Sequence, residues 1–156
     1  MRNLRHTILA TVVLATGLFL IMGCSHEGGN PVGTSELQMA RLMGSWNAKS
    51  TQLDNIDKEG FQNFVLTLSP LPDQPRLSYI ISENPYASPW RTVTTGSLSL
   101  DQDQPDKYLV REDGAVIEYV VTDNTLSMRF TFADSKTGGK ISGVGGEWIF
   151  LFEKNN

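Results

Sequence analysis

The sequence of 156 residues has almost no cysteine or histidine. The single cysteine is Cys24 and the two histidines are His6 and His26, so no thiol and no imidazole follow residue 26. A domain built from the rest of the chain can hold no disulfide bond, no zinc site with Cys or His ligands, and no Ser-His-Asp or Cys-His catalytic group. We therefore expect a protein that is not an enzyme and that uses no metal or other cofactor.

Basic residues are also scarce. Lys and Arg number 13 against 17 Asp and Glu. Arg2 and Arg5 lie in an N-terminal segment that we expect to be removed, which leaves 11 basic against 17 acidic residues, a net charge of −6. Nucleic-acid affinity depends on clustered Lys and Arg. The charge balance therefore argues against a nucleic-acid partner.

The N-terminal segment has an apolar run that is too short to span a bilayer. Residues 8–22 are almost wholly apolar and follow Arg2 and Arg5. A spanning helix needs about 20 such residues, whereas a charged start and a shorter apolar run are typical of a secretory signal peptide. We expect residues 1–23 to be that signal peptide.

The end of this segment, Leu20-Ile21-Met22-Gly23-Cys24, resembles a bacterial lipobox. The resemblance implies cleavage before Cys24, followed by attachment of a diacylglycerol and of an acyl chain such as palmitate to that residue. Two or three acyl chains hold a protein firmly on a membrane. Cys24 is thus the predicted lipidation site and the lipid bilayer of the bacterial envelope the predicted partner. Ser25 is compatible with export to the outer membrane, and an ordinary signal peptide is the alternative.

The residues after Cys24 predict a spacer and then one domain. Residues 25–34 contain three Gly and one Pro and few apolar side chains. Such a composition cannot pack into a core and is typical of a flexible tether. We therefore divide the chain into a signal peptide at 1–23, a tether at 24–34 and a folded domain at 35–156.

The folded domain begins with one helical pattern and continues with strands only. Residues 37–43 are good helix formers, with Ser35 as a candidate cap and Gly44 just after the end. From Ser45 onward apolar residues alternate with polar ones, as in half-buried strands. Asp113-Gly114 indicates a two-residue hairpin, and Gly96 indicates a bend or bulge within its strand. The expected strands are 46–53, 61–69, 77–81, 90–100, 107–112, 115–122, 125–133 and 147–154.

Eight consecutive strands with short turns predict an all-β, up-and-down antiparallel barrel with one short N-terminal helix. Closure of the sheet removes its exposed edges. The last strand is apolar on both faces, so we expect the helix to cover its outer face. We expect Trp46 to fill the end of the barrel where that helix lies.

Three short motifs fall at corresponding places of a known family. They are Gly44-Ser45-Trp46 at the first strand, Thr122-Asp123 between the sixth and seventh, and Gly146-Glu147-Trp148-Ile149-Phe150-Leu151-Phe152 at the last. Together they resemble the lipocalin-like domains of small bacterial lipoproteins over about residues 37–154. The resemblance implies structural roles for Gly44 and Trp46. It also implies an Arg on the last strand, which this chain lacks.

Three further patterns have simple structural explanations. The acidic residues 101–106 fit a solvated hairpin loop better than a calcium loop, because the glycine and the flanking helices of an EF-hand are missing. The glycine-rich residues 136–146 precede a strand and not a helix, so they predict a long connection and not a phosphate site. A two-residue turn at 113–114 would place Arg111 diagonal to Glu118, as a surface ion pair or as a pair inside the barrel.

The aromatic residues give the functional prediction. Many of them share the apolar phase of the strands, and Tyr and Trp bring polar groups that need partners. We expect non-catalytic binding of a small apolar ligand inside the barrel. The alternative is a filled barrel that acts as a protein-interaction or enzyme-inhibitor module on an envelope protein. The predicted ligand-binding residues are Tyr79, Tyr119, Met128, Phe130, Trp148 and Phe150.

Overall fold

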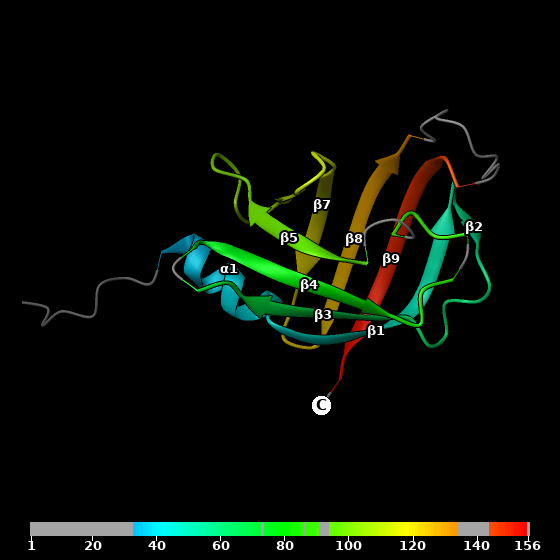
Figure 1. Ribbon diagram of the computed structural model, residues 1–156, viewed down its shortest axis with the longest axis horizontal. Helices are drawn as coiled ribbons and strands as arrows, with labels where there is room; N and C mark the ends of the chain where they lie inside the picture. Colours follow the sequence, from blue (N-terminus) through cyan, green and yellow to red (C-terminus); the bar gives the residue numbers. More distant parts are fainter. Residues whose placement is uncertain (1–32, 73, 86, 91–93, 134–143, 156) are drawn as a thin grey trace, which may run out of the picture. The chain divides into compact units, whose positions relative to one another are not determined.

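The computed structural model describes residues 33–72, 74–85, 87–90, 94–133 and 144–155 (Figure 1). All of them belong to one compact unit, Pro31–Asn156. The predicted signal peptide, Cys24, nearly all of the predicted tether and most of the glycine-rich segment lie outside the described residues. No helix in the described part of the chain has the length and apolar character to span a membrane.

The described residues form one short helix and a closed antiparallel barrel. Each strand pairs with the next along the sheet, and β1 also pairs with β9, which closes the eight-stranded barrel of β1 and β3–β9. The two-residue β2 only extends the end of β1. This confirms the predicted up-and-down barrel. The elements are α1 (Thr34–Leu42), β1 (Gly44–Leu53), β2 (Ile56–Asp57), β3 (Val65–Pro70), β4 (Arg76–Ser82), β5 (Thr95–Leu100), β6 (Tyr108–Arg111), β7 (Val116–Val121), β8 (Thr125–Phe132) and β9 (Gly146–Lys154).

The alternation of the strands sets which side chains fill the barrel. Leu77, Tyr79 and Ile81 of β4 are buried, while the residues between them are partly or fully exposed. The same holds for β8 and β9, where every second side chain is buried. Since successive strand residues point to opposite faces, one apolar phase is enough to build the core. The inward residues of these two strands are Leu126, Met128, Phe130, Trp148, Phe150 and Phe152.

The helix closes one end of the barrel through Trp46. The indole Nε1 donates a hydrogen bond to the carbonyl oxygen of Leu42 at 2.8 Å, and both residues are fully buried. Lys154 of β9 places its ammonium 5.1 Å from the centre of the Trp46 ring and donates to the Arg41 carbonyl at 3.5 Å. Lys154 therefore links the last strand to Trp46 and to the end of α1.

Two expectations for α1 were wrong. The helix does not cover the outer face of β9, because it lies at the end of the barrel and Leu151 of β9 remains 40% exposed. Ser35 does not cap it either. The N-cap is Gly33, and no side chain caps the first turn.

Two strands are shorter than predicted because buried loop residues extend the apolar pattern. Strand β3 begins at Val65 and β5 at Thr95, so Phe61, Phe64 and Trp90 lie in loops. All three are nonetheless buried, Phe61 with 5% exposure and the others with none. Apolar loop residues that fold into a barrel end cannot be told from strand residues by alternation alone.

The hairpin between β6 and β7 has a three-residue loop, which corrects the predicted register. Tyr108 is opposite Glu118, Leu109 opposite Ile117 and Val110 opposite Val116. The loop is 112–114, and Gly114 takes the positive φ of +86° that such a loop requires. A one-residue change in register moves side chains to the other face. Arg111 shares the inward face of β6 with Leu109, and the change in register puts Ile117 on that face. Glu118 points out and lies 4.0 Å from the Lys107 ammonium.

Candidate functional site

Aromatic rings occupy the interior of the barrel, with Phe150 at their centre. Six other rings lie around it, with centroid distances of 5.6–6.4 Å. The ring of Phe130 is nearly parallel to it and that of Trp90 is edge-on. These are the distances of ring pairs in direct contact. The other neighbours are Phe61, Phe64, Trp148 and Phe152.

The barrel end opposite α1 is covered by apolar residues from its connecting segments. Phe61 comes from the segment between β2 and β3, Trp90 from that between β4 and β5, and Val144 from that before β9. The indole Nε1 of Trp148 donates to the Val144 carbonyl at 2.8 Å, which fixes Val144 against the core. Both ends of the barrel are thus lined with buried side chains.

A buried arginine is the main polar group there. The Arg111 side chain has no solvent exposure, and its Nε and Nη2 donate to the two carboxylate oxygens of Asp113, both at 2.8 Å. Its guanidinium carbon lies 4.7 Å from the centre of the Trp90 ring and 5.6 Å from that of Phe130. Hydrogen bonds from Arg111 hold the pKa of Asp113 below its usual range, against the opposing effect of burial. Arg111 is thus a charged group held by one carboxylate and two aromatic faces.

Three polar atoms gathered around Trp90 have no hydrogen-bond partner in the described part of the chain. They are the Tyr79 hydroxyl, the Trp90 Nε1 and the Arg111 Nη1, all in residues at most 1% exposed. The Tyr79 and Trp90 rings are in edge contact at 5.5 Å, and Arg111 stacks on the same indole. We call Tyr79, Trp90 and Arg111 the Trp90 cluster. Buried polar groups almost always have partners, so three such atoms in contacting residues make the Trp90 cluster the candidate binding site.

Gly96 explains how the Tyr79 hydroxyl is accommodated. Gly96 is directly opposite Tyr79 in regular pairing of β4 and β5, so the predicted bulge is wrong. A Cβ at this position would lie 2.8 Å from the Tyr79 oxygen and closer still to the Glu112 Oε1. The missing side chain therefore leaves room for the phenol and the carboxylate. Glu112 is held there by the Ser97 amide, which donates to its Oε2 at 3.2 Å.

Burial suppresses the ionisation of two tyrosines. It raises the pKa of Tyr79 to about 12, although Arg111 works in the opposite direction and Glu112 and Asp113 add to the rise. Burial also raises the pKa of Tyr119 to about 12, with a further contribution from Asp106. In the unfolded chain both groups would ionise near the usual tyrosine pKa of about 10.

We predict a loss of stability in alkaline solution from these two groups. A raised pKa in the folded state leaves stability intact below about pH 10 and removes it as the pH rises towards 12. Absorbance titration of tyrosinate, with the unfolding midpoint measured at each pH, tests this. Tyr79→Phe should remove part of the high-pH absorbance step. Complete ionisation of every tyrosine near pH 10 in the folded protein would contradict the prediction.

The predicted ligand-binding residues fall into three groups. Tyr79 belongs to the Trp90 cluster and Phe130 contacts it. Trp148 and Phe150 belong to the neighbouring ring stack, and Met128 is fully buried opposite Phe150. Tyr119 is not brought to this site, because its hydroxyl donates to the Pro105 carbonyl near the α1 end.

Sequence reasoning did not include Trp90 among the candidate ligand residues, and it left open whether Arg111 points into the barrel. Trp90 lies in a loop, where no period indicates which way a side chain points. Arg111 follows Leu109 at a spacing of two, so it shares the inward phase of β6 whatever the length of the loop that follows. This alternation was the signal in the sequence that could have placed Arg111 inside the barrel.

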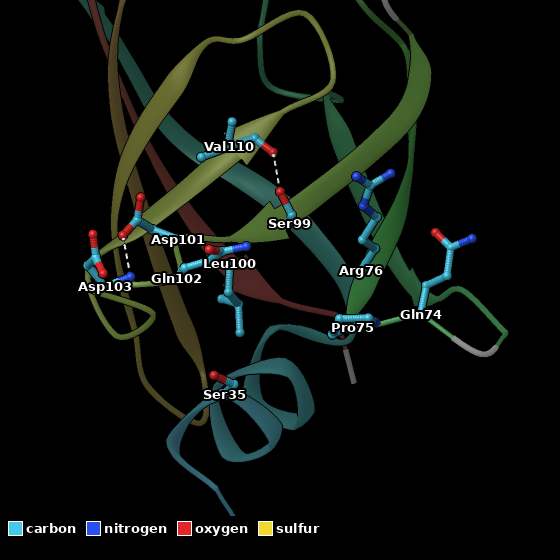
Figure 2. A pocket seen from close by; sticks show the side chains of 10 residues that line it. All are labelled: Ser35, Gln74, Pro75, Arg76, Ser99, Leu100, Asp101, Gln102, Asp103 and Val110. Carbon is cyan, nitrogen blue, oxygen red and sulfur yellow. Dashed lines mark hydrogen bonds between the residues drawn. The ribbon is translucent and has the colours of Figure 1, made fainter.

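A surface hollow lies at the α1 end of the barrel. It has a volume of about 810 Å³ and lies between α1, the start of β4 and the segment after β5 (Figure 2). Its polar groups are already bonded or exposed: Ser99 Oγ donates to the Val110 carbonyl, and Arg76 is on the surface. It therefore lacks the buried unpartnered atoms of the Trp90 cluster. Its lining is Ser35, Gln74, Pro75, Arg76, Ser99, Leu100, Asp101, Gln102, Asp103 and Val110.

The acidic loop beside this hollow is organised by its own backbone. Asp101 Oδ1 accepts hydrogen bonds from the Asp103 and Gln104 amides at 3.0 and 2.9 Å. Such a bond pattern is that of an Asx turn. Within the described residues, no three His, Cys, Asp or Glu side chains come together in a way that could hold a metal ion.

The fold and the site define an eight-stranded antiparallel barrel with a buried polar cluster at the end opposite its helix. Comparison of the chain with family models, with curated proteins and with solved structures found no match.

Proposed function

We propose that this protein is a lipoprotein of the bacterial envelope, anchored through Cys24, whose barrel binds a small, largely apolar ligand without catalysis. The binding site is the Trp90 cluster and the aromatic rings that surround it. The lipobox resemblance and the short apolar leader support the anchor. The unpartnered atoms of Tyr79, Trp90 and Arg111 support the binding site, and they are the observation that carries the proposal.

The size of the ligand follows from the packing. The ring stack around Phe150 occupies the middle of the barrel, and Trp46 with Leu42 occupies the α1 end. An extended lipid chain along the barrel axis would have to displace these side chains. A shorter ligand at the end opposite α1 needs to displace less, because the Trp90 and Phe130 faces already form an apolar wall there.

Palmitate labelling tests the anchor. Wild-type protein expressed in bacteria grown with labelled palmitate should carry the label, and Cys24→Ser should carry none, because the thioether forms on that sulfur. Ser25→Ala is the matched control and should keep the label. Label on the Cys24→Ser protein, or none on the wild type, would show that Cys24 is not the lipidation site.

Binding of a neutral apolar probe tests the site. The chain from residue 25 onward contains the whole compact unit Pro31–Asn156. A thermal unfolding curve is recorded first, and a cooperative transition is required before binding is measured. N-phenyl-1-naphthylamine should bind it at about one equivalent and quench tryptophan emission, because Trp90 lines the site and Trp148 is one ring away from it. Absence of saturable binding to the folded chain would rule the site out.

A protein-interaction module is the second candidate, on the basis of an exposed apolar surface. Val116 and Val120 of β7 are 54% and 64% exposed, and Leu151 of β9 lies two strands away in the same row as Val120. A hollow of about 250 Å³ beside Val120 includes Glu118 and Arg129. Exposed apolar side chains around a polar hollow fit a protein contact. Failure of probe binding, with site-specific cross-linking from position 120 to one envelope protein, would favour this function.

A further inference from the structure

We infer that the Trp90 cluster recognises a neutral oxygen acceptor on its ligand, such as an ester, ketone or amide carbonyl, and discriminates against a carboxylate. The inference rests on the proposed ligand-binding function and names the chemical class of the ligand. It follows from the donors that the cluster presents and from the charges that surround them.

The cluster presents mainly donors. The Trp90 Nε1 can only donate, and so can the Arg111 Nη1, whose sister nitrogens are taken by Asp113. The Tyr79 hydroxyl can donate or accept. A ligand group that fits these atoms must therefore accept hydrogen bonds. An amine or ammonium group would find only the phenol oxygen as an acceptor among them.

The charges favour a neutral acceptor over an anion. The positive charge of Arg111 is already paired with Asp113 through two hydrogen bonds of 2.8 Å. Glu112 adds a second carboxylate, whose Oε1 lies, like the Tyr79 oxygen, within 3 Å of one point above Gly96. A carboxylate ligand would lose its hydration and enter a region whose net charge is already negative. A carbonyl oxygen accepts the same hydrogen bonds without that electrostatic cost.

The aromatic side chains around the donors determine the chemistry of the remainder of the ligand, which must be apolar. The faces of Trp90 and Phe130 stand next to Arg111, and Tyr79 meets the Trp90 ring at its edge. The ligand would place its carbonyl at the three donors and a short apolar group against these rings. Medium-chain esters, such as methyl octanoate, are therefore suitable test compounds.

Displacement of N-phenyl-1-naphthylamine from the chain from residue 25 onward tests the inference. Methyl octanoate should displace the probe at a concentration about tenfold lower than octanoate or octylamine at neutral pH. Equal or better displacement by octanoate would overturn the neutral-acceptor assignment while leaving the binding function in place. Absence of any saturable probe binding would overturn the binding function as well.

Tyr79→Phe gives a second readout that needs no tight ligand. Removal of a hydroxyl with no protein partner should leave the unfolding midpoint unchanged or higher, and it should weaken displacement by methyl octanoate about fivefold, the effect of one neutral hydrogen bond. Tyr119→Phe is the matched control: it is equally buried, but its hydroxyl is bonded to Pro105. That variant should lose stability and keep ester binding. A fall in the midpoint of Tyr79→Phe like that of Tyr119→Phe would show that the Tyr79 hydroxyl is bonded within the protein, and would overturn the inference.

Discussion

Replacement of Phe150 by alanine should lower the free energy of unfolding by about 3–5 kcal/mol. Phe150 has no solvent exposure and six aromatic neighbours within 6.4 Å. Removal of its ring leaves a cavity that those neighbours, fixed on separate strands and loops, can only partly fill. Typical domains have a total stability of about 5–15 kcal/mol, so the loss is a large part of it.

Denaturant unfolding of Phe150→Ala beside Leu151→Ala measures this effect. Leu151 is the next residue on β9 and points outward with 40% exposure, so its truncation controls for the change in strand propensity. Leu151→Ala should cost less than about 1 kcal/mol, as surface changes usually do. A cost below about 1 kcal/mol for Phe150→Ala would mean that its ring does not pack as described.

Replacement of Trp46 by alanine should have a comparable effect, about 3–5 kcal/mol, at the other end of the barrel. The change removes a fully buried indole, its hydrogen bond to the Leu42 carbonyl and the ring beneath the Lys154 ammonium. The helix α1 at the same time loses the hydrogen bond that joins its last residue, Leu42, to β1. We therefore expect a sharp fall in the thermal midpoint.

Trp46→Phe separates the two contributions. This variant keeps most of the apolar ring and removes the indole donor. The free energy of unfolding should fall by about 0.5–1.5 kcal/mol for the lost hydrogen bond, with a further small loss for the smaller ring. Both variants are measured by thermal unfolding followed by circular dichroism. A shift of only a degree or two for Trp46→Ala would contradict the placement of Trp46 at this end.

The barrel could be predicted from sequence because its strands follow one simple rule. Alternation in β4, β8 and β9 identifies the inward residues, and the short turns between strands leave little choice of topology. Thus Tyr79, Met128 and Phe150 were assigned to the interior, where the structure places them. The absence of a second helical pattern completed the prediction, since a parallel sheet would have required crossover helices.

What alternation cannot supply is the conformation of the loops, and the polar cluster depends on it. One extra residue in the 112–114 loop puts Ile117, and not Glu118, on the face that Arg111 shares with Leu109, so the predicted pairing of Arg111 with Glu118 is lost. Trp90 lies in a loop and yet packs in the core. The role of Gly96 depends on the Tyr79 hydroxyl beside it, which the sequence of β5 does not reveal. The predicted ligand residues therefore gave the aromatic wall of the site and only one of its three polar atoms.

Native mass spectrometry of the lipoprotein, released gently from bacterial membranes, tests the central claim most directly. The account predicts one small neutral molecule with a carbonyl group bound to each barrel, lost in Tyr79→Phe more readily than in Tyr119→Phe. Recovery of the folded protein with no bound molecule, together with no saturable binding of N-phenyl-1-naphthylamine, would contradict it.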